Sequence, residues 1–404
     1  MDNSTVRSNQ VDSYDYIIAG AGCAGLSLLH YIIQSPALST KRVLVIDTSF
    51  NKTNDRTWCF WETESGSFEH LVRKTWNRIS VHHQGFNKIL ETAPFTYKMI
   101  EGIDFYKDII DAAKGKSNIY WQEAKVEKIE SKEAMGVVTW NGNKATAPYV
   151  FSSILPFHMN DLKSASNYSE TTILDTSAPF LWQHFKGRVV QFEQPIFNPS
   201  VARLMDFNVP QHDSTAFMYL LPIDDKKALI EYTLFSSEMI APEQYDLAMN
   251  EYLATHYPSL KYNTLHEEIG AIPMTQQYFD TATAPIYLIG ALGAAIKSST
   301  GYAFQFIQQQ AKNIVQQLEN NQPILTKVHT TRHQFYDAVL LYILHHKKME
   351  GKEIFSSIFK KNKAATVFKF LSNTSSFLED INIMRSLPTR IFLPAAIQVL
   401  LRRL

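Results

Sequence analysis

The sequence predicts an α/β protein in which a Rossmann-like dinucleotide-binding domain carries an inserted mixed β-sheet and is followed by a helical C-terminal region. Three observations support this fold class. A glycine-rich turn at residues 20–25 joins an apolar strand to a helix. Strand-like segments recur between 178 and 235, and a helical pattern continues from about residue 330.

The glycine turn has the spacing G-x-G-x-x-G, and Asp47 follows it at the end of a second apolar strand. Gly20 permits the tight turn, Gly22 lets a pyrophosphate approach the backbone, and Gly25 lets the helix pack closely on the sheet. The helix N-terminus then offers N–H groups to phosphate, and Asp47 accepts ribose hydroxyls. The alternative is a turn that needs glycine only for packing. The cofactor-binding residues predicted here are Gly20, Ala21, Gly22, Cys23, Ala24, Gly25 and Asp47.

The chain divides into five segments on this interpretation. They are a disordered tail at 1–13, the first part of the dinucleotide-binding domain at 14–155, a substrate-binding β-sheet insertion at 156–280, the return strand and helix of the first domain at 281–325, and a helical region at 326–404. Within the insertion, strands are predicted at 178–185, 187–192, 201–207, 215–223 and 227–235. Charged and aromatic residues alternate without a period at 52–62, which predicts a loop that covers a ligand.

Composition excludes some classes of function. The 404 residues contain 39 basic and 39 acidic side chains, and a net charge of zero argues against a nucleic-acid-binding protein. The two cysteines, Cys23 and Cys59, give neither a disulfide framework nor the spacing of a metal site, which fits a reducing cytosol. No metal site is predicted.

The late part of the chain returns to the dinucleotide-binding pattern. A buried strand at 285–289 ends at Gly290, a glycine- and serine-rich segment extends to Gly301, and a helix is predicted at 302–320. A late strand–glycine–helix unit that rejoins an N-terminal glycine turn indicates a flavoprotein fold, in which the flavin half of the cofactor reaches the late segment. Gly290, Gly293 and Gly301 are therefore predicted to contact the cofactor.

Several motifs distributed along the chain identify a family. They are Gly20–Leu26, Asn54–Trp61, Leu204–Phe207, Leu229–Thr233, Gly270–Met274, Lys297–Tyr302 and Ile383–Pro388. With these motifs the chain resembles the lycopene β-cyclase family of flavoproteins over residues 14–396. The R-T-W-C-F-W run, the L-I-E strand and the K-S-S-T-G-Y turn in this order are more specific than the glycine turn. Related hydroxylases have Asp-Gly where this chain has Ser152-Ser153, and Asp where it has Ala291. These departures weaken a hydroxylase interpretation and leave the flavin ribityl contacts unassigned.

The resemblance implies a Rossmann-like FAD-binding domain and an intramolecular lyase, a class of isomerase. Such an enzyme converts the acyclic ends of lycopene into β-rings, giving γ-carotene and then β-carotene. A proton adds to the terminal double bond, the neighbouring double bond attacks the carbocation, a ring closes and a proton leaves, without net redox change. The resemblance also implies reduced FAD as the active form of the cofactor and NAD(P)H as the source of reducing equivalents.

Two acids within apolar strand patterns are the candidate catalytic residues. Burial would raise the pKa of Glu231 and keep it protonated, as proton donation requires. A half-solvated strand face explains an acid at this position equally well, and only the resemblance favours catalysis. Asp206 would share a proton with Glu231, orient it, or bond a turn at the end of its strand. By the resemblance, Arg56 contacts the phosphate or ribityl part of the cofactor, and a surface arginine is the alternative.

The C-terminal region predicts contact with a membrane. From Lys347 to Leu404 there are 11 basic and 4 acidic residues. Lysines at 347–369 surround apolar residues such as Ile354 and Phe368, which predicts an interfacial surface attracted to anionic lipid and a peripheral location on the cytoplasmic side of the membrane. A solvated helical face over the core is the alternative.

Two other functions stay open at this point. One is an FAD-dependent monooxygenase or reductase that acts on a lipid or isoprenoid substrate and consumes NAD(P)H in proportion to its product. The other is a non-catalytic isoprenoid carrier on the same fold. The oligomeric state is not predicted.

Overall fold

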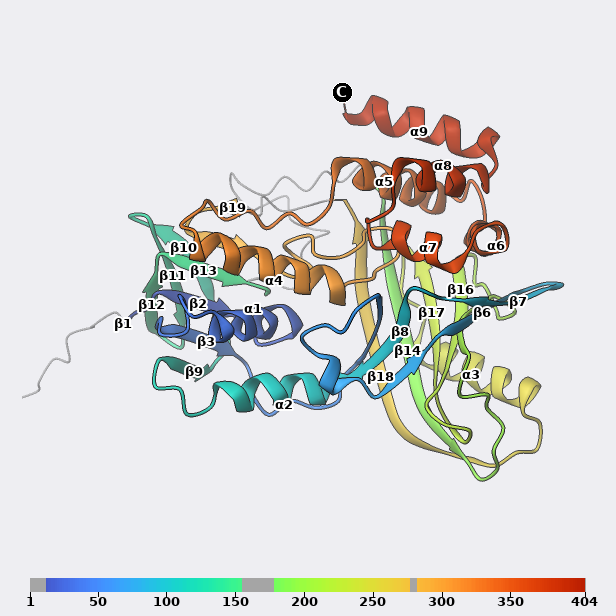
Figure 1. Ribbon diagram of the computed structural model, residues 1–404, viewed down its shortest axis with the longest axis horizontal. Helices are drawn as coiled ribbons and strands as arrows, with labels where there is room; N and C mark the ends of the chain where they lie inside the picture. Colours follow the sequence, from blue (N-terminus) through green and yellow to red (C-terminus); the bar gives the residue numbers. More distant parts are fainter. Residues whose placement is uncertain (1–11, 155–177, 277–281, 404) are drawn as a thin grey trace, which may run out of the picture.

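The computed structural model describes residues 12–154, 178–276 and 282–403, which form two sheet-based halves and a layer of C-terminal helices (Figure 1). Residues 1–11 of the predicted tail lie outside the described residues, as does 155–177 at the start of the predicted insertion. Strand β1 (Asp12–Ser13) pairs in parallel with β12 (Asn143–Ala147). The prediction of a disordered tail is therefore wrong for the two residues of β1.

The dinucleotide-binding half is built on a sheet with the strand order β19-β20-β13-β2-β3-β9. Its strands are β2 (Tyr16–Ala19), β3 (Val43–Asp47), β9 (Ile119–Glu123), β13 (Tyr149–Ser152), β19 (Ala282–Thr283) and β20 (Ile286–Leu288). All neighbours pair in parallel except β19 with β20, so the carboxyl ends of β2, β3 and β13 lie along one edge. The Rossmann-like arrangement predicted from the sequence is confirmed.

Both faces of this sheet are covered. Helices α1 (Cys23–Gln34), α2 (Gly102–Ala113) and α4 (Phe304–Glu319) pack on one face through a buried apolar cluster. A second sheet, β1-β12-β11-β10, with β10 (Lys128–Lys132) and β11 (Met135–Trp140), covers the other face. Burial on both sides explains why the central strands are apolar without alternation.

The second half is a seven-stranded mixed sheet with the order β18-β14-β17-β16-β15-β6-β7. Its strands are β6 (Arg78–His83), β7 (Phe86–Glu91), β14 (Phe180–Phe192), β15 (Ala202–Asp206), β16 (Thr215–Pro222), β17 (Lys227–Ser236) and β18 (Tyr262–Thr275). The hairpin β6–β7 lies outside 156–280, so this sheet is not a single contiguous insertion. Strand β14 is continuous where two strands were predicted, and the sequence analysis did not predict β18.

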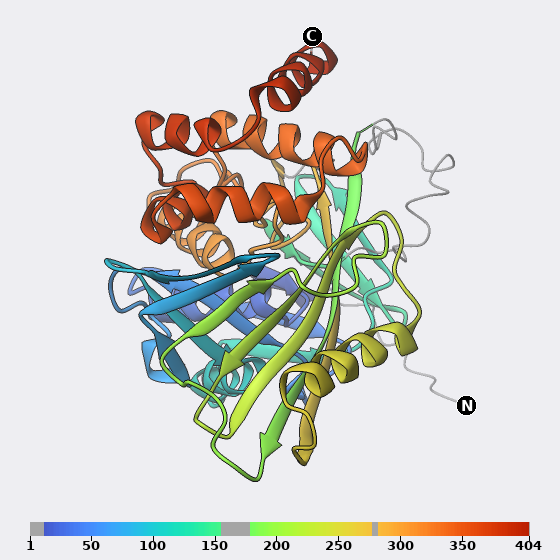
Figure 2. The same cartoon turned by 90° about the vertical axis from the view of Figure 1, so that its right-hand side faces the viewer.

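The two faces of the seven-stranded sheet meet different partners (Figure 2). Helix α3 (Pro242–His256) packs on one face, where Met218, Ile230 and Tyr232 are fully buried. The other face carries Phe217 and Leu229 in one apolar cluster with the C-terminal helices and β4. An acid on this sheet therefore faces either α3 or the rest of the molecule.

A small sheet, β4-β8-β5, connects the two halves, with β4 (Thr57–Glu62), β5 (Lys74–Trp76) and β8 (Thr96–Glu101). Residues 57–62 were predicted as part of a loop, and this prediction is wrong because they pair with β8 over their whole length. Alternation along β4 divides the aromatic run, since Trp58 and Phe60 pack with α2 and α4 whereas Trp61 stacks on Phe368.

The C-terminal region is helical, as predicted. It comprises α5 (Thr331–His345), α6 (Gly351–Lys361), α7 (Ala364–Leu371), α8 (Phe377–Arg385) and α9 (Thr389–Arg403). The apolar residues that were predicted to face lipid, among them Ile354, Phe359 and Phe368, are buried in the core. That prediction is wrong for these residues, because α6 and α7 turn them toward the seven-stranded sheet.

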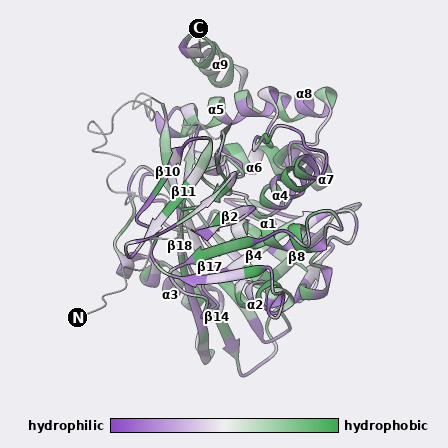
Figure 3. Ribbon diagram, turned by 90° about the vertical axis from the view of Figure 1, so that its left-hand side faces the viewer, coloured by the Kyte–Doolittle hydropathy of each residue, from purple (hydrophilic) through white to green (hydrophobic). Residues whose placement is uncertain are grey.

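Exposed apolar residues lie further along the chain, on α8 and α9. Figure 3 shows hydrophobic stretches alternating with hydrophilic ones on both helices. The exposed apolar side chains of this region are Phe377, Leu378, Met384, Leu393, Ile397, Leu400 and Leu401. Within the described ranges, no helix combines the length and the hydropathy needed to span a bilayer.

Candidate active site

The glycine turn leads from β2 into the N-terminus of α1. Gly22 is the N-cap, and among the described residues no side chain caps the helix and no atom lies within 4 Å of a Cβ added to Gly22. Gly20 has a φ of +100°, and a Cβ on Gly25 would lie 1.9 Å from the carbonyl oxygen of Gly20. The turn therefore has open space at the position predicted for a pyrophosphate and close packing at the two other glycines.

Asp47 lies at this turn. Its Oδ2 accepts a hydrogen bond from the backbone N–H of Ala21 at 2.5 Å, and its Oδ1 lies 3.1 Å from Nζ of Lys52. Cys23 and Ala24 form the first turn of α1, and burial raises the pKa of the Cys23 thiol to about 12. The predicted first set of cofactor residues thus comes together at one edge of the parallel sheet.

The late glycines pack against this region and against the second sheet. Gly290 has a φ of +65°, and a Cβ there would lie 2.7 Å from Cβ of Ala24 on α1. Gln310 of α4 accepts a hydrogen bond from the Gly290 N–H and donates one to the Gly293 carbonyl. Gly301 has a φ of +69°, and a Cβ there would lie 1.9 Å from Oε1 of Gln183. Only glycine lets this turn lie so close to β14.

The turn before α4 is held in place by residues of the C-terminal helical region. The Nζ of Lys297, which is fully buried, lies 2.8 Å from Oδ1 of Asp337 on α5 and donates to Oδ1 of Asn373 at 2.8 Å. The hydroxyl of Ser299 also donates to Asp337, at 2.6 Å. Within the part of the chain that the structure describes, no side chain caps the N-terminus of α4, which leaves its first N–H groups as possible donors to a ligand.

Glu231 belongs to a row of directly paired residues that crosses four strands. Tyr219 of β16 pairs with Glu231 of β17, which in turn pairs with Gly187 of β14. Gly187 also pairs with Glu268 of β18 on its other side. Directly paired residues point to the same face, so the two glutamates flank a position without a side chain. A Cβ on Gly187 would lie 3.1 Å from Cγ of Glu268, and the glycine leaves this space to the carboxyl group.

The two glutamates interact with each other and with two threonines. Burial and the neighbouring Glu268 raise the pKa of Glu231 to about 8, and burial raises the pKa of Glu268 to about 7. The hydroxyl of Thr233 donates to Oε1 of Glu231 at 2.7 Å, and that of Thr57 on β4 donates to Oε2 of Glu268 at 2.9 Å. Glu231 is half-buried while Glu268 is 4% exposed, so Glu231 is the more accessible member of the pair.

Aromatic and polar groups from three elements surround Glu231. The hydroxyls of Tyr219 and Tyr302 lie near each other, and burial, with a smaller contribution from the nearby Glu231, raises the pKa of both phenols. The ring of Trp61 contacts that of Tyr302 edge-on at 4.7 Å. A pocket of about 410 Å³ is lined by Cys59, Trp61 and Tyr302 together with residues of α4. The Glu231 row therefore lies where β4, the turn before α4 and the seven-stranded sheet meet.

Buried polar atoms without partners gather at the same junction. Among the described residues, Oε1 of Gln183 and Oγ1 of Thr300 have no hydrogen-bond partner. Oε1 of Glu268 likewise has no hydrogen-bond donor among the described residues. Buried polar atoms usually have partners, so this group indicates a position for a polar ligand.

Arg56 lies on the outer side of the junction. Its side chain is 52% exposed, and its Nη2 forms an ion pair with Asp55 at 2.7 Å. Burial raises the pKa of Cys23 at the glycine turn and that of Glu268, and the charge of Arg56 partly offsets both increases. Arg56 therefore lies between the pyrophosphate turn and the acid pair, where the sequence analysis predicted a cofactor contact.

Asp206 is separated from Glu231 by the thickness of the sheet. It pairs with Met218 on the face that α3 covers. Its Oδ2 accepts a hydrogen bond from Tyr252 of α3 at 2.9 Å and lies 3.1 Å from Nη1 of Arg203, and its Oδ1 accepts two hydrogen bonds from Asn208. The prediction that Asp206 shares a proton with Glu231 or orients it is wrong, because a shift of register at β15 turns the carboxylate to the other face.

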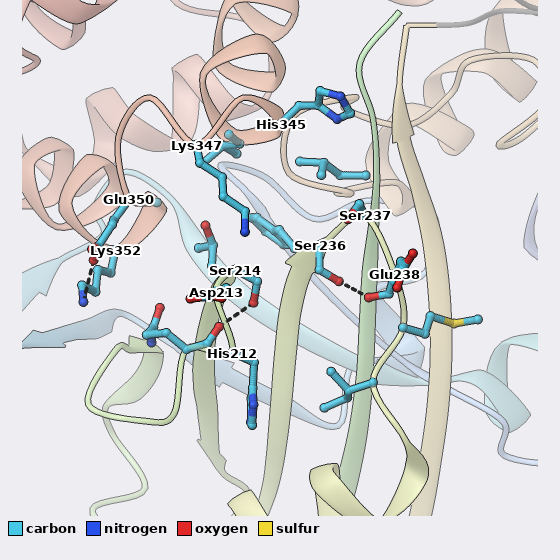
Figure 4. A pocket seen from close by; sticks show the side chains of 18 of the residues that line it. His212, Asp213, Ser214, Ser236, Ser237, Glu238, His345, Lys347, Glu350 and Lys352 are labelled. Carbon is cyan, nitrogen blue, oxygen red and sulfur yellow. Dashed lines mark hydrogen bonds and ion pairs between the residues drawn. The ribbon is translucent and has the colours of Figure 1, made fainter. Parts of the chain in front are cut away.

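A second pocket, of about 640 Å³, lies at the end of β16 and β17 next to the turn between α5 and α6 (Figure 4). His345, Lys347 and Lys352 line it from the helical side, and Asp213 and Glu238 line it from the loops of the sheet. Lys347 and Lys352 had been predicted to face lipid. They border this pocket instead.

Comparison with known proteins places the chain in a family. The profile described as lycopene cyclase protein matches residues 15–396. The chain belongs to the lycopene cyclase family. No match was found among curated protein sequences.

Solved structures share the fold of this lycopene cyclase family member at low sequence identity. A geranylgeranyl bacteriochlorophyll reductase-like protein from Thermoplasma acidophilum is 12% identical with a TM-score of 0.59, and the match covers 98% of this chain and 100% of that chain. A flavoprotein/dehydrogenase from Cytophaga hutchinsonii has the same identity and TM-score, with 97% and 100% covered. A variant of HpxO from Klebsiella pneumoniae, complexed with FAD, is 12% identical with a TM-score of 0.59, with 89% and 98% covered.

Sequence reasoning missed three members of the site in this lycopene cyclase family member. Glu268, Gly187 and Thr57 lie on β18, β14 and β4, and only the pairing of strands brings them to Glu231. One signal was present, because the G-A-I-P-M motif begins at Gly270, two residues after Glu268. Residues two apart on a strand share a face, so that motif and the acid belong together.

Proposed function

We propose that this protein is a lycopene β-cyclase that uses FAD in its reduced form and closes β-rings at the acyclic ends of lycopene, giving γ-carotene and then β-carotene. The reaction is an isomerisation without net redox change, and NAD(P)H supplies the electrons that keep the flavin reduced. One observation carries the proposal. In a chain of the lycopene cyclase family, Glu231 is half-buried beside a second carboxyl group, with a pKa raised to about 8, at the junction of the two halves.

The residues at the junction fit an FAD molecule. The uncapped N-terminus of α1 and the open space at Gly22 suit the pyrophosphate, and Asp47 suits the adenosine ribose. The uncapped N-terminus of α4 and the unpartnered Gln183 and Thr300 suit the polar edge of the isoalloxazine. Reduced FAD, when bound, supplies negative charge that stabilises a carbocation without electron transfer. Arg56 lies within reach of this region as a cation for the phosphates.

Glu231 performs the proton chemistry in this proposal. Its carboxylic acid is protonated at neutral pH and gives its proton to the terminal double bond of the polyene. The neighbouring double bond attacks the carbocation, and the six-membered ring closes. A proton leaves the ring carbon to give the β-ring and returns to the carboxylate, so no proton is consumed. Thr233 keeps the carboxyl group oriented by donating to Oε1.

Aromatic rings on the Glu231 face of the sheet stabilise the carbocation. Tyr219 and Tyr302 border the acid, the ring of Trp61 contacts that of Tyr302 edge-on, and an aromatic face attracts a nearby cation by roughly 0.5–2 kcal/mol. Trp58, Phe60 and Phe304 pack together as core instead, with Phe60 stacked on Phe304 at 4.7 Å. The surroundings of Glu231 thus combine a proton donor with apolar, cation-stabilising walls.

Expression in a lycopene-producing host, followed by pigment chromatography, tests this function. The expected result is conversion of lycopene to γ-carotene and β-carotene, with NAD(P)H needed only to keep the flavin reduced. Consumption of NAD(P)H in proportion to product would instead indicate a monooxygenase or reductase. Unchanged lycopene bound to folded protein would indicate a carrier.

We also propose that the protein lies peripherally on the cytoplasmic side of the membrane and binds lipid through the outer surface of α8 and α9. Leu393, Ile397, Leu400 and Leu401 recur at the spacing of one helical face and are between 48% (Ile397) and 61% (Leu401) exposed. The opposite face of α9, which includes Ala395 and Val399, is buried. An anionic lipid surface suits the charge, because residues 381–404 contain four arginines and no acid.

Flotation with vesicles tests this surface. Wild type is expected to bind vesicles that contain phosphatidylglycerol and to bind phosphatidylcholine vesicles less. A double variant, Ile397→Glu with Leu401→Glu, should lose binding, whereas the matched control Leu247→Glu on α3, also an exposed leucine, should keep it. Loss of a concentration-dependent dimer in the double variant, with vesicle binding unchanged, would assign the surface to a second copy of the chain.

A further inference from the structure

Glu268 has a position that neither the family nor the sequence analysis explains. It lies on β18, one strand beyond Gly187, and its carboxyl group reaches over that glycine toward Glu231. The preceding residue, Glu267, points to the other face and forms ion pairs with Arg188 and Lys186. Two adjacent acids on one strand therefore have opposite environments, and among the described residues no cation forms an ion pair with Glu268.

The groups that face Glu268 do not neutralise it. Thr57 supplies one neutral hydrogen bond from β4, and Arg56 is 52% exposed and paired with Asp55. The other titratable groups near the acid pair are Cys59 of β4, Tyr219 of β16 and Tyr302 of the turn before α4, and burial favours the neutral form of each. Two neighbouring carboxyl groups without a close cation cannot both be ionised at low cost.

We propose that Glu231 and Glu268 share one proton, and that Glu268 is a positioning residue that holds this proton on Glu231 and orients it. The proposal extends the cyclase mechanism and rests on it for its catalytic consequence. The raised pKa of both groups supports this arrangement, and so does their hydrogen bond, which favours protonation of Glu231 and ionisation of Glu268. The unpartnered Oε1 of Glu268 is the acceptor for that proton.

The proton balance follows from one proton on the pair. The resting pair carries one negative charge, on Glu268. Transfer of the proton from Glu231 to the olefin leaves two carboxylates facing a carbocation, so Coulomb attraction stabilises the intermediate. When the ring carbon loses its proton, the pair takes it back, and the resting charge is restored. No oxidant, reductant or additional base is required.

Infrared titration of the purified holoenzyme tests the sharing without any turnover. In wild type, the carbonyl band of a protonated carboxyl group should persist above neutral pH. In Glu268→Gln, the midpoint of the Glu231 titration should fall by about one unit or more, because the negative neighbour is replaced by an amide that donates a hydrogen bond to the carboxylate. The control Glu267→Gln, on the opposite face, should leave the midpoint unchanged.

The pH profile of cyclisation tests the catalytic consequence. A proton donor is active below its pKa, so the pH at which the Glu268→Gln rate falls should move down with the infrared midpoint. Glu268→Asp, which is shorter by one methylene and reaches less far over Gly187, should shift both midpoints by an intermediate amount. A merely structural role for Glu268 would lower the rate at every pH and leave the profile in place.

The outcomes separate this proposal from the proposed function. An unchanged Glu231 midpoint in Glu268→Gln, in protein with the wild-type circular dichroism spectrum, overturns the sharing of a proton. A shifted midpoint in a protein that leaves lycopene unchanged supports the shared proton and rejects the cyclase.

Discussion

The two faces of the seven-stranded sheet each present an acid from an apolar strand, and the two acids have opposite surroundings. Asp206 has hydrogen-bond donors at both oxygens, a guanidinium 3.1 Å away and α3 packed over it. Glu231 has one hydroxyl donor and a second carboxyl group as its neighbour. The first arrangement fixes a charge in place as part of the structure, and the second keeps a proton available at neutral pH.

This comparison shows that a strand pattern alone does not distinguish a structural acid from a reactive one. Both residues follow apolar neighbours, as L-M-D-F and L-I-E-Y, and both would be assigned to a buried strand. The difference arises from partners far away in sequence, such as Tyr252 for Asp206 and Glu268 for Glu231. Changing each acid in turn therefore tests whether Asp206 is structural and Glu231 is reactive.

The largest effect is expected for the proton donor. Glu231→Gln removes the transferable proton and keeps the size of the side chain, so the rate of lycopene cyclisation should fall by about a thousand-fold. Product formation is measured by chromatography with flavin held reduced, and Glu267→Gln serves as the control. A variant that cyclises lycopene at more than half of the wild-type rate would show that another group donates the proton.

A smaller effect, on stability and not on chemistry, is expected for the acid under α3. Asp206→Ala removes the carboxylate that pairs with Arg203 and the acceptor of the Tyr252 hydroxyl, which should lower the free energy of unfolding by about 3 kcal/mol. Urea denaturation measures this loss. The folded fraction should keep the wild-type pH profile of cyclisation. A displaced profile would mean that Asp206 influences the titration of Glu231 on the other face of the sheet.

The sequence predicted the parts of the fold that depend on local pattern. Hydrophobic periodicity, together with the glycine and proline residues between segments, predicts the glycine turn, the late strand β20 with helix α4, and most strands of the second sheet. Strand β4 was mistaken for a loop, because its aromatic residues pack on both sides and hide the alternation. The hairpin β6–β7 joins β15 over a long sequence distance, which no local pattern encodes.

The candidate site was predicted in part. Glu231 and the glycines were found from motifs, whereas Glu268 was missed because two adjacent acids in H-E-E-I-G resemble a solvated segment. Asp206 was placed wrongly because the shift of register at β15 reverses its face. The lipid-facing surface was placed on α6 and α7, since an amphipathic pattern does not say whether its apolar side meets a membrane or a sheet.

The smallest effect expected from the comparison is a change in how stability depends on pH. The pKa of Glu231 is raised from 4.5 to about 8 in the folded protein, so between these values the folded state keeps a proton that the unfolded state has lost. The free energy of unfolding of wild type should therefore fall as pH rises through this window. Glu231→Gln removes this contribution. It should match wild type near pH 4 and be more stable than wild type near pH 8, as measured by urea denaturation at each pH. Equal slopes for the two proteins would mean that Glu231 is ionised in the folded state, as a structural acid would be.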